Sequence, residues 1–293
     1  MMNQPESPVK PMNPVKPTES PVPTSTVNAL NPLRGANPTA GVWSTMRSAV
    51  LEATSNKRAL IFQMVVMILN DLAWIGFWTI FFRRTGDVRG WNMDKVILLW
   101  TVLTTAGGLV LGLLANTRNI ATLAMNGGLD SVLTLPVHPL PNLLVRRVEP
   151  TNFGDVTFGV ALFAFAGHPT PIRVLTFVLC VIGSTIILAS FLILVSSLSF
   201  YTGRTDGAEL GFNSILLVSA YPIDIFSGAL KTAFFTLIPA AFIASVPAGL
   251  INHFNPTVAA EFLVAAIVFA FLATVTFHSA LRHYTSASSW TRA

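Results

Sequence analysis

VILLWTVLTTAGGLVLGLLA, residues 96–115, is the stretch that decides the fold class of this chain. Its 20 residues include no charged side chain. The hydrocarbon core of a bilayer is about 30 Å thick, and roughly 20 residues of α-helix cross it at about 1.5 Å per residue. Lipid offers no hydrogen-bond partner to the backbone, so a long apolar run that lies in it must be helical. The stretch therefore predicts a membrane-spanning helix.

Apolar segments of the same kind lie on both sides of this stretch. The chain of 293 residues is 52% hydrophobic and 11% charged, and its mean hydropathy of +0.63 is outside the usual range of soluble domains. The short alternating segments of a membrane β-barrel are absent from the sequence. We therefore predict an all-α polytopic membrane protein with six transmembrane helices, at about residues 60–82, 96–115, 153–166, 172–200, 206–222 and 258–281.

The segments outside the spans divide the chain further. Residues 1–41 are rich in Pro and polar side chains and are expected to form a disordered cytoplasmic tail, because they hold too little apolar surface to offset the entropy of ordering. Residues 42–59 favour an amphipathic elbow helix on the membrane surface, with Trp43 on its apolar face, or else a plain extension of the first span. The membrane domain is expected to cover residues 42–285, before a short cytoplasmic tail at 286–293.

Residues 223–251 are apolar enough for the membrane but are interrupted by Pro239 and Pro247. We expect a helical pair that re-enters from the outer side, because broken backbone at lipid depth is tolerated only where protein covers it. This keeps the number of crossings even. A modest excess of Arg and Lys on one side then places both chain ends and residues 116–150 in the cytoplasm.

Two short patterns predict contacts between helices. Gly108 and Gly112 are four residues apart in the second span, a spacing that allows another helix to approach closely. The turn at residues 168–171 contains two prolines and predicts that the third and fourth spans are antiparallel neighbours.

The sequence carries no recognisable catalytic pattern. It has no G-x-x-x-x-G-K-[ST] phosphate loop, no dinucleotide-binding glycine pattern and no H-E-x-x-H zinc motif. The five His residues lack the spacing of a metal site, and the net charge of +5 is scattered through loops, which favours anionic lipid over nucleic acid. Ser196, Ser197 and His278 are the only set that an intramembrane protease could use, and serines in a span are more often packing residues. We therefore predict no enzyme activity, metal or cofactor in this chain.

Two carboxylates fall within the expected spans, where burial in lipid is costly and function is the default interpretation. Asp71 adjoins Asn70 near the middle of its span and is expected to line a pathway or to meet a partner across an interface. Asp155 lies near the start of the third span. For it we favour a helix cap or a side chain that reaches the cytoplasmic surface near Arg146 and Arg147, over a role in a pathway.

The insert, residues 116–150, connects the second and third spans and reads NTRNIATLAMNGGLDSVLTLPVHPLPNLLVRRVEP. Its spacing predicts a short helix over residues 118–125, a break at two glycines, and a second helix that begins at Leu129. Pro136, Pro139 and Pro141 are expected to stop this helix before another begins near residue 142. A rigid insert of broken helices is suited to docking rather than catalysis, and an ordinary ordered loop is the alternative.

Two motifs carry a resemblance that covers about residues 42–285. The insert resembles that of the membrane subunits of ABC-2 type ABC transporters, and a later pattern is similar to one bacterial six-span branch of that family. Leu135 departs from the branch, which commonly has Arg at this position. The insert motif is Gly128, Leu129, Asp130, Leu133, Pro136, Pro139 and Leu140. The later motif is Tyr221, Pro222, Ile223, Ile225 and Phe226, followed by Ile238, Pro239, Ala241, Phe242, Ile243, Pro247 and Ala248.

The resemblance implies a permease subunit in a bacterial inner membrane that exports a substrate. It implies two separate cytoplasmic ATPase subunits, which hold the ATP and Mg²⁺, and a second permease subunit that is identical or paralogous. A self-contained channel, secondary carrier or membrane scaffold is the alternative function. The resemblance places ATPase coupling at Arg118, Gly128, Leu129, Asp130, Leu133, Pro136, Pro139 and Leu140, and we expect pathway or interface roles for Asn70, Asp71, Asp155, Tyr221, Pro222, Pro239 and Pro247.

Overall fold

The structure is a computed structural model, and it describes residues 38–135 and 137–284. The expected C-terminal tail, most of the expected N-terminal tail and Pro136 lie outside the described residues. Within the described ranges the regular structure is helical, apart from one isolated β-bridge between Val88 and Trp91. The prediction of an all-helical protein is therefore confirmed.

Four described helices are long and apolar enough to cross a membrane. Polar side chains satisfy the free N–H groups at their first turns: Asn92 Oδ1 accepts from Lys95 N at 3.0 Å, and Asn255 Oδ1 accepts from Thr257 N at 2.9 Å. These helices correspond to the first, second, fourth and sixth expected spans. They are α3 (Lys57–Thr85), α4 (Met93–Leu113), α9 (Pro171–Thr202) and α13 (Pro256–Leu281).

The third and fifth expected spans are also helices, but they are short. α8 (Phe153–Ala166) and α10 (Asp206–Ser219) have 14 residues each. That is about 21 Å of helix, less than the roughly 30 Å of a hydrocarbon core. By length and composition the described chain therefore has four spans, or up to five if the bent pair of helices near its end is counted as one.

This bent pair consists of α11 (Gly228–Thr236) and a helix that starts with a π-helical turn (Ala241–Ser245) and continues as α12 (Val246–Asn252). The two parts are bent by 71°. Pro239 lies in the bend. Pro247 has no N–H to donate to the carbonyl of Ile243, and the wider π turn before it accommodates the missing bond.

α4 lies at the centre of the helix packing. In the most apolar 18-residue stretch of α4, 83% of the residues are buried, compared with 6% in the corresponding stretch of α3. α4 packs against α8, α9 and α12. A Cβ atom on Gly108 would lie 2.7 Å from the backbone oxygen of Asn152, and one on Gly159 of α8 would overlap the Thr105 hydroxyl. The predicted close approach at Gly108 and Gly112 is therefore confirmed, and α8 is the helix that approaches.

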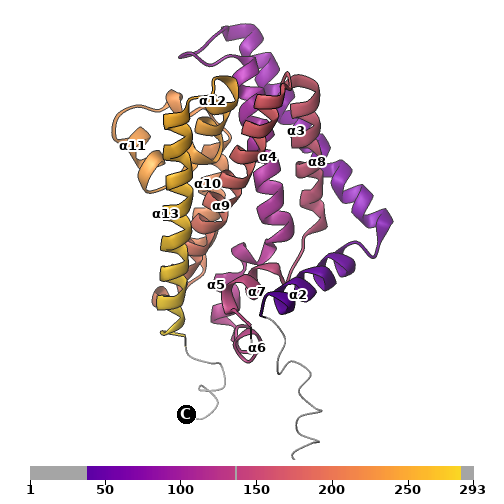
Figure 1. Cartoon of the computed structure of the whole chain (residues 1–293), viewed down its shortest axis with the longest axis vertical. Coiled ribbons are helices and arrows are strands. Elements are labelled where there is room, and N and C mark those ends of the chain that lie inside the picture. Colours follow the sequence, from indigo (N-terminus) through magenta and orange to yellow (C-terminus); the bar gives the residue numbers. More distant parts are fainter. Residues whose placement is uncertain (1–37, 136, 285–293) are drawn as a thin grey trace, which may run out of the picture. The chain divides into compact units, whose positions relative to one another are not determined.

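The turn at residues 168–171 does not make α8 and α9 neighbours along their lengths, so that prediction was wrong. α8 packs on α3 and α4, whereas α9 packs on α4, α10 and α13, and α4 lies between α8 and α9 in Figure 1. Phe163 and Phe177 stack near the turn, with ring centroids 4.2 Å apart. α8 instead packs against the face of α4 that carries Gly108 and Gly112. On α9, the ring of Phe262 from α13 fills the space beside Gly183.

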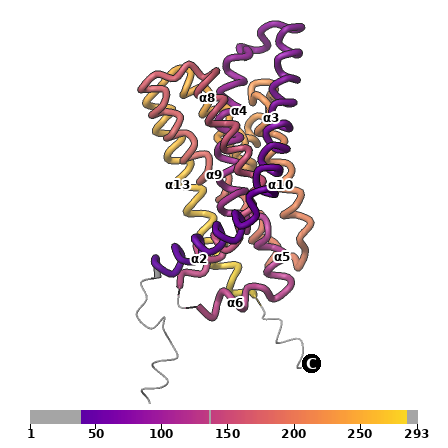
Figure 2. Tube along the Cα trace, turned by 90° about the vertical axis from the view of Figure 1, so that its right-hand side faces the viewer, coloured from indigo at the N-terminus to yellow at the C-terminus, as the bar shows by residue number. Residues whose placement is uncertain are grey.

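Figures 1 and 2 both place α2, α5 and α6 at one end of the bundle, which we call the insert end. The α3–α4 loop lies at the opposite end. α2 packs on α7, and it begins at Pro38, before the expected elbow. Its Trp43 is 67% exposed rather than packed. The bounds are α2 (Pro38–Ala53), α5 (Ile120–Met125), α6 (Asp130–Leu133) and α7 (Pro139–Val145).

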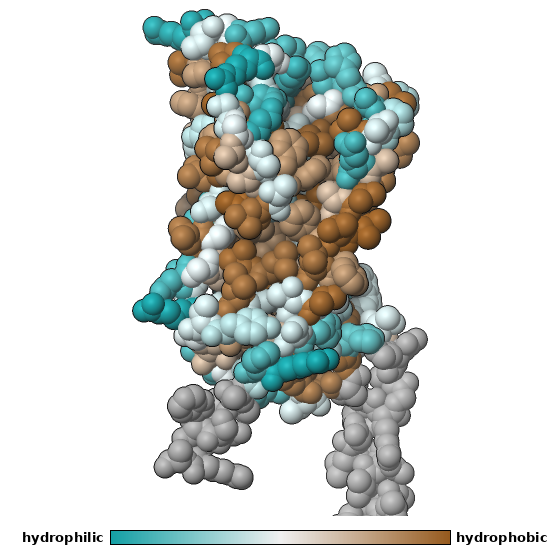
Figure 3. All heavy atoms as spheres, turned by 90° about the vertical axis from the view of Figure 1, so that its left-hand side faces the viewer, coloured by the Kyte–Doolittle hydropathy of each residue, from teal (hydrophilic) through white to brown (hydrophobic). Residues whose placement is uncertain are grey.

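Apolar side chains cover much of the outside of the bundle. The face shown in Figure 3 is apolar across its middle and more hydrophilic toward both ends. On α3 and α13 the large exposed apolar side chains include Phe62, Leu69, Ile267 and Phe271. A soluble protein rarely exposes apolar surface on this scale, so this surface is suited to lipid.

Candidate functional site

A cavity of about 350 Å³ lies between α3, α4, α8 and α10. It brings together the two carboxylates that the sequence placed in separate spans. The cavity is lined by Met67, Asn70, Asp71 and Trp74 of α3, by Trp100, Leu103, Thr104, Gly107 and Leu111 of α4, by Asn152 and Asp155 at the start of α8, and by Leu216, Leu217 and Ala220 at the end of α10.

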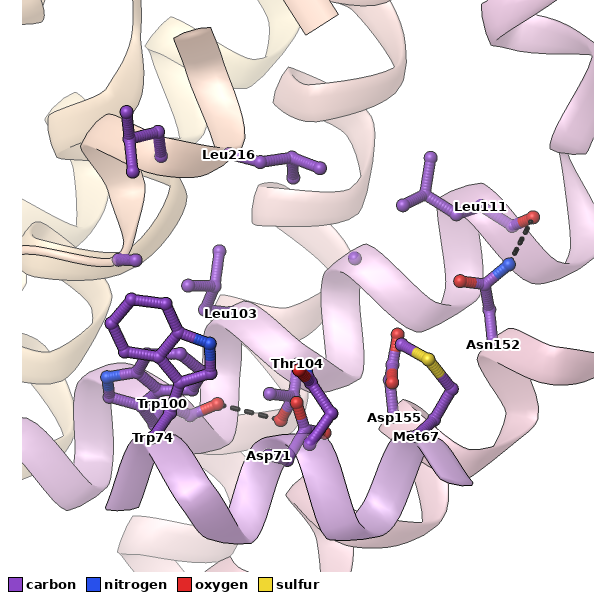
Figure 4. A pocket seen from close by; sticks show the side chains of 14 residues that line it. Met67, Asp71, Trp74, Trp100, Leu103, Thr104, Leu111, Asn152, Asp155 and Leu216 are labelled. Atoms are coloured by element: carbon purple, nitrogen blue, oxygen red, sulfur yellow. Dashed lines mark hydrogen bonds between the residues drawn. The ribbon is translucent and has the colours of Figure 1, made fainter. Parts of the chain in front are cut away.

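Both carboxyl groups are buried in the wall of this cavity. Asp71 is 4% exposed and Asp155 is 9% exposed. Among the described residues, Asp71 Oδ2 and Asp155 Oδ1 have no hydrogen-bond partner. Asp71 reaches this wall from α3 and Asp155 reaches it from α8 (Figure 4). The cavity therefore holds two carboxyl groups that the protein leaves incompletely satisfied.

The surface position that we expected for Asp155 is wrong. Arg146 Nη1 donates to Ser131 instead, and Arg147 pairs with Glu149. The first turn of α8 is tightly packed on α3, because a Cβ atom on Gly154 would lie 2.6 Å from the backbone oxygen of Met64. This packing holds the next residue, Asp155, inside the bundle.

Two indole rings form the other polar part of the cavity wall. Trp74 and Trp100 are stacked, with centroids 5.5 Å apart and planes 27° apart. Trp100 is 4% exposed, and its Nε1 has no hydrogen-bond partner among the described residues. In Figure 4 the indole pair lies at one side, Asp155 lies toward the other, and Asp71 and Thr104 lie between them. The remaining walls are mostly aliphatic.

Sequence reasoning did not single out Trp100, Thr104 or Asn152. A signal was present, because Trp100 and Thr104 are one helical turn apart and share a face of α4. Thr104 Oγ1 donates to the backbone oxygen of Trp100 at 2.7 Å, and Asn152 Nδ2 donates to the oxygen of Leu111 at 3.1 Å. Without the fold, nothing indicated that this face meets Asp71 and Asp155.

Four residues with expected pathway roles lie outside the cavity. The Tyr221 ring packs on Trp78, with centroids 5.7 Å apart, and its neighbour Ala220 reaches the cavity wall. Pro222, Pro239 and Pro247 are buried among the helices. Their positions indicate that they shape the bent pair and the end of α10 rather than line the cavity.

The insert has a buried face and an exposed face. Leu129 and Leu140 belong to an apolar cluster that also contains Phe200 of α9 and Phe277 of α13. Met125 and Leu133 are each 38% exposed. Pro139 begins α7 rather than stopping a helix, because proline at a first helical position loses no hydrogen bond.

Polar contacts tie the insert to its surroundings. Tyr284 donates from its hydroxyl to Asp130 Oδ1 at 2.9 Å, and Ser196 Oγ of α9 donates to the oxygen of Thr117 at 3.1 Å. Burial, together with the hydrogen bond and the charge of Asp130, raises the pKa of Tyr284 to about 12. The guanidinium of Arg118 lies 4.6 Å from the centre of the Phe212 ring on α10. The insert is thus connected to three helices of the bundle.

The serines and histidine that a protease could use are not arranged for catalysis. Ser196 Oγ binds the insert backbone, and Ser197 Oγ donates to the oxygen of Ile193 at 2.7 Å. His278 is exposed, and its Nδ1 lies 2.8 Å from the oxygen of Thr274. Among the described residues there is also no group of three or more His, Cys, Asp or Glu side chains that could hold a metal ion.

Long apolar helices around a cavity with two carboxyl groups, joined to a folded insert at one end, are features of a polytopic membrane protein. The family model described as "ABC-2 family transporter protein" matches residues 66–288. The chain therefore belongs to the ABC-2 transporter family and is an ABC transporter permease. No match was found among curated proteins or among solved structures.

Proposed function

We propose that the chain is the membrane subunit of an ABC exporter, driven by ATP that separate cytoplasmic ATPase subunits hydrolyse. Membership of the ABC-2 family supports the permease role. The observation that carries the coupling role is the two-faced insert. Its inner face packs on α9 and α13, while Met125 and Leu133 stay exposed for a partner.

The contacts of the insert give a route for force. A partner that pushes on α5 and α6 would move Leu129, which packs in one cluster with Phe200 and Phe277 at the ends of α9 and α13. It would also move Arg118, whose contact with Phe212 reaches α10, and α10 lines the cavity. Rigid-body rocking of these helices would open the cavity to one side of the membrane at a time.

The proposed topology has six crossings, with α8 and α10 completing the set. α2, the insert and Tyr284 lie at the same end, as an even number of crossings requires. We place this end in a bacterial cytoplasm, α2 on the inner membrane surface, and the bent pair of α11 and α12 as a re-entrant segment on the outer side. Two ATPase subunits and a second permease subunit complete the transporter.

The docking role is tested with variants on the exposed face of the insert. Met125→Glu and Leu133→Glu place a charge where an apolar contact is proposed. Each should reduce the ABC ATPase that copurifies with the full chain from its host membranes by at least tenfold, as measured by mass spectrometry. Ile225→Glu is the matched control, because Ile225 is apolar, 40% exposed and at the opposite end.

Normal membrane levels of all three variants would show that insertion is intact. Undiminished ATPase recovery with both insert variants would refute docking at this face. If no ABC ATPase copurified with the unchanged chain and transport proceeded without nucleotide, the chain would instead be a self-contained channel or carrier.

A further inference from the structure

The cavity between α3, α4, α8 and α10 contains polar atoms that the protein itself does not satisfy. Asp71 Oδ2, Asp155 Oδ1 and Trp100 Nε1 have no hydrogen-bond partner among the described residues, and each of these side chains is more than nine-tenths buried. Leaving a buried polar group unpaired is costly, and more so for a charged one. Three such groups around one cavity indicate a place that a ligand completes.

Within the part of the chain that the structure describes, no positively charged side chain lines this cavity. None of the residues that line it is Lys, Arg or His. The nearby basic residues of the insert have other partners: Arg118 lies over Phe212, Arg146 bonds to Ser131, and Arg147 pairs with Glu149. Among the described residues, then, no basic side chain of the cavity can pair with Asp71 or Asp155, and a cation that pairs with them has to come from a ligand.

A metal ion is a poor fit for these residues. Two carboxyl groups are the only acidic side chains of the cavity, with neutral oxygens from Asn70, Thr104 and Asn152, and the described residues contain no group of three or more His, Cys, Asp or Glu that could hold a metal ion. Stacked Trp74 and Trp100 instead offer the faces of aromatic rings, which attract organic cations. Leu103, Leu111 and Leu216 make the rest of the wall apolar. A volume of about 350 Å³ suits a small organic molecule.

The cavity reaches the outside of the bundle between α3 and α10. Asn70 of α3 and Leu217 of α10 both line it and are both exposed, Leu217 at 58%. The surrounding surface of α3 is apolar, with Leu69 and Leu72 at least half exposed. A ligand that arrives this way has to tolerate an apolar environment.

We propose that this cavity binds a lipophilic organic cation, with its charge between Asp71 and Asp155 and its aromatic or aliphatic body against Trp74 and Trp100. As an assignment of the transported substrate class, this proposal rests on the function proposed above. The proposed binding site does not depend on that function, because it is argued only from the residues that line the cavity.

Matched ions of opposite charge test the site. Tetraphenylphosphonium and tetraphenylborate have nearly the same size and apolar surface. Equilibrium binding of each, radiolabelled, is measured to the purified full chain in nanodiscs, with empty nanodiscs as the blank. The phosphonium should bind saturably, and the borate should bind at least tenfold more weakly. If the unchanged chain binds the two ions equally, or shows no saturable phosphonium binding, the proposal is refuted.

Near-isosteric variants locate the site. Asp71→Asn and Asp155→Asn should each weaken phosphonium binding by at least tenfold, because each removes a carboxyl group that can pair with the cation. Asp94→Asn is the control, since Asp94 is exposed in the first turn of α4 and does not line the cavity. Unchanged binding in both cavity variants would place the cation elsewhere and refute the assignment.

The binding assay contains neither ATPase nor ATP, so its failure is distinct from failure of the proposed function. If an ATPase copurifies with the chain but the chain does not bind phosphonium, the exporter function would remain supported and the assignment of an organic-cation substrate would be refuted. If phosphonium binding is saturable and depends on Asp71 but no ATPase copurifies with the chain, the binding site would be supported and the exporter function would be refuted.

Discussion

Asp224 connects segments that are far apart in the sequence. Trp91 Nε1, from the α3–α4 loop, donates to Asp224 Oδ2 at 2.9 Å, and Lys231 of α11 pairs with Oδ1 at 2.6 Å. Arg89 donates to the backbone oxygens of Asp224 and Ile225 at 3.1 and 2.8 Å. These contacts hold the α3–α4 loop against the start of the bent pair, at the end opposite the insert.

The charges and hydrogen bonds around Asp224 determine how its contribution to the free energy of unfolding depends on pH. Partial burial raises the pKa of this carboxyl, but the hydrogen bonds from Lys231 and Trp91 and the charges of Lys231 and Lys95 outweigh burial, so the pKa lies below its ordinary value. A lowered folded-state pKa means that the stabilisation is present above the unfolded-state pKa, which is about 3.9. It is lost as the pH falls through the folded-state value.

At the residue scale we predict that Asp224→Asn lowers the stability of the full chain at pH 7. The loss should be about 1 kcal/mol, since the pair is partly exposed, which corresponds to roughly 2–4 °C in Tm. The difference from the unchanged chain should start to shrink below about pH 4, the unfolded-state pKa, and should disappear as the pH falls through the lower pKa of the folded carboxyl. Thermal unfolding in detergent at both pH values measures this.

Asp87→Asn in the α3–α4 loop is the control, because Asp87 is exposed, and it should leave Tm unchanged. An Asp224→Asn protein that unfolds at the same temperature as the unchanged chain at pH 7 would contradict the prediction.

At the scale of elements, the contact between α4 and α8 organises the bundle and the cavity. Glycines allow it, because side chains at Gly108 and Gly159 would overlap atoms of the other helix. This close contact holds the first turn of α8 beside α3 and α4. Asp155 thereby comes to lie near Asp71, so the geometry of the cavity depends on helix packing.

We predict that Gly108→Ala destabilises the bundle whereas Gly107→Ala does not. The new methyl group at residue 108 would lie 2.7 Å from Asn152 O and 2.8 Å from Val156 N. Both are backbone atoms, so no side-chain rotation can relieve the overlap. Overpacking of this kind costs about 1–3 kcal/mol. At the adjacent Gly107, a Cβ atom has nothing within 4 Å.

Thermal unfolding of both alanine variants measures the difference. Because the two differ by one position in the same helix, intrinsic helix propensity cancels between them. Equal Tm values for the two would show that the contact between α4 and α8 is looser than described.

At the scale of the whole molecule, the two ends of the bundle have different contents. The insert end carries α2, the insert and Tyr284, and the other end carries the α3–α4 loop and the start of the bent pair. If the bent pair is re-entrant, both of its flanks must face the same side of the membrane.

We predict that Ser227→Cys, before α11, and His253→Cys, after α12, react with an impermeant maleimide added to intact cells. Both residues are exposed. Thr202→Cys, at the end of α9 on the insert side, should react only after the membrane is opened. The background is Cys180→Ala, because Cys180 is the only native cysteine. Labelling of only one of the two flanks in intact cells would show that the bent pair crosses the membrane.

Local sequence features were enough to predict the class of the protein and most of its helices. α8 begins and ends at the expected residues, 153 and 166, and the break in the insert falls at the expected glycines. These features are local: apolar length, glycine, proline and capping residues act within a few positions of themselves. Pro139 was misplaced because proline is equally suited to the first turn of a helix.

The pairing of helices, by contrast, became known from the folded structure. The sequence alone did not reveal that α8 would pack on α4 rather than α9, because that choice depends on glycines of each helix meeting backbone and side-chain atoms of the other. The same packing buried Asp155, placed it with Asp71 and Trp100 in one cavity, and gave the insert its inner and outer faces. These are contacts between residues distant in the chain, and close packing in three dimensions determines them.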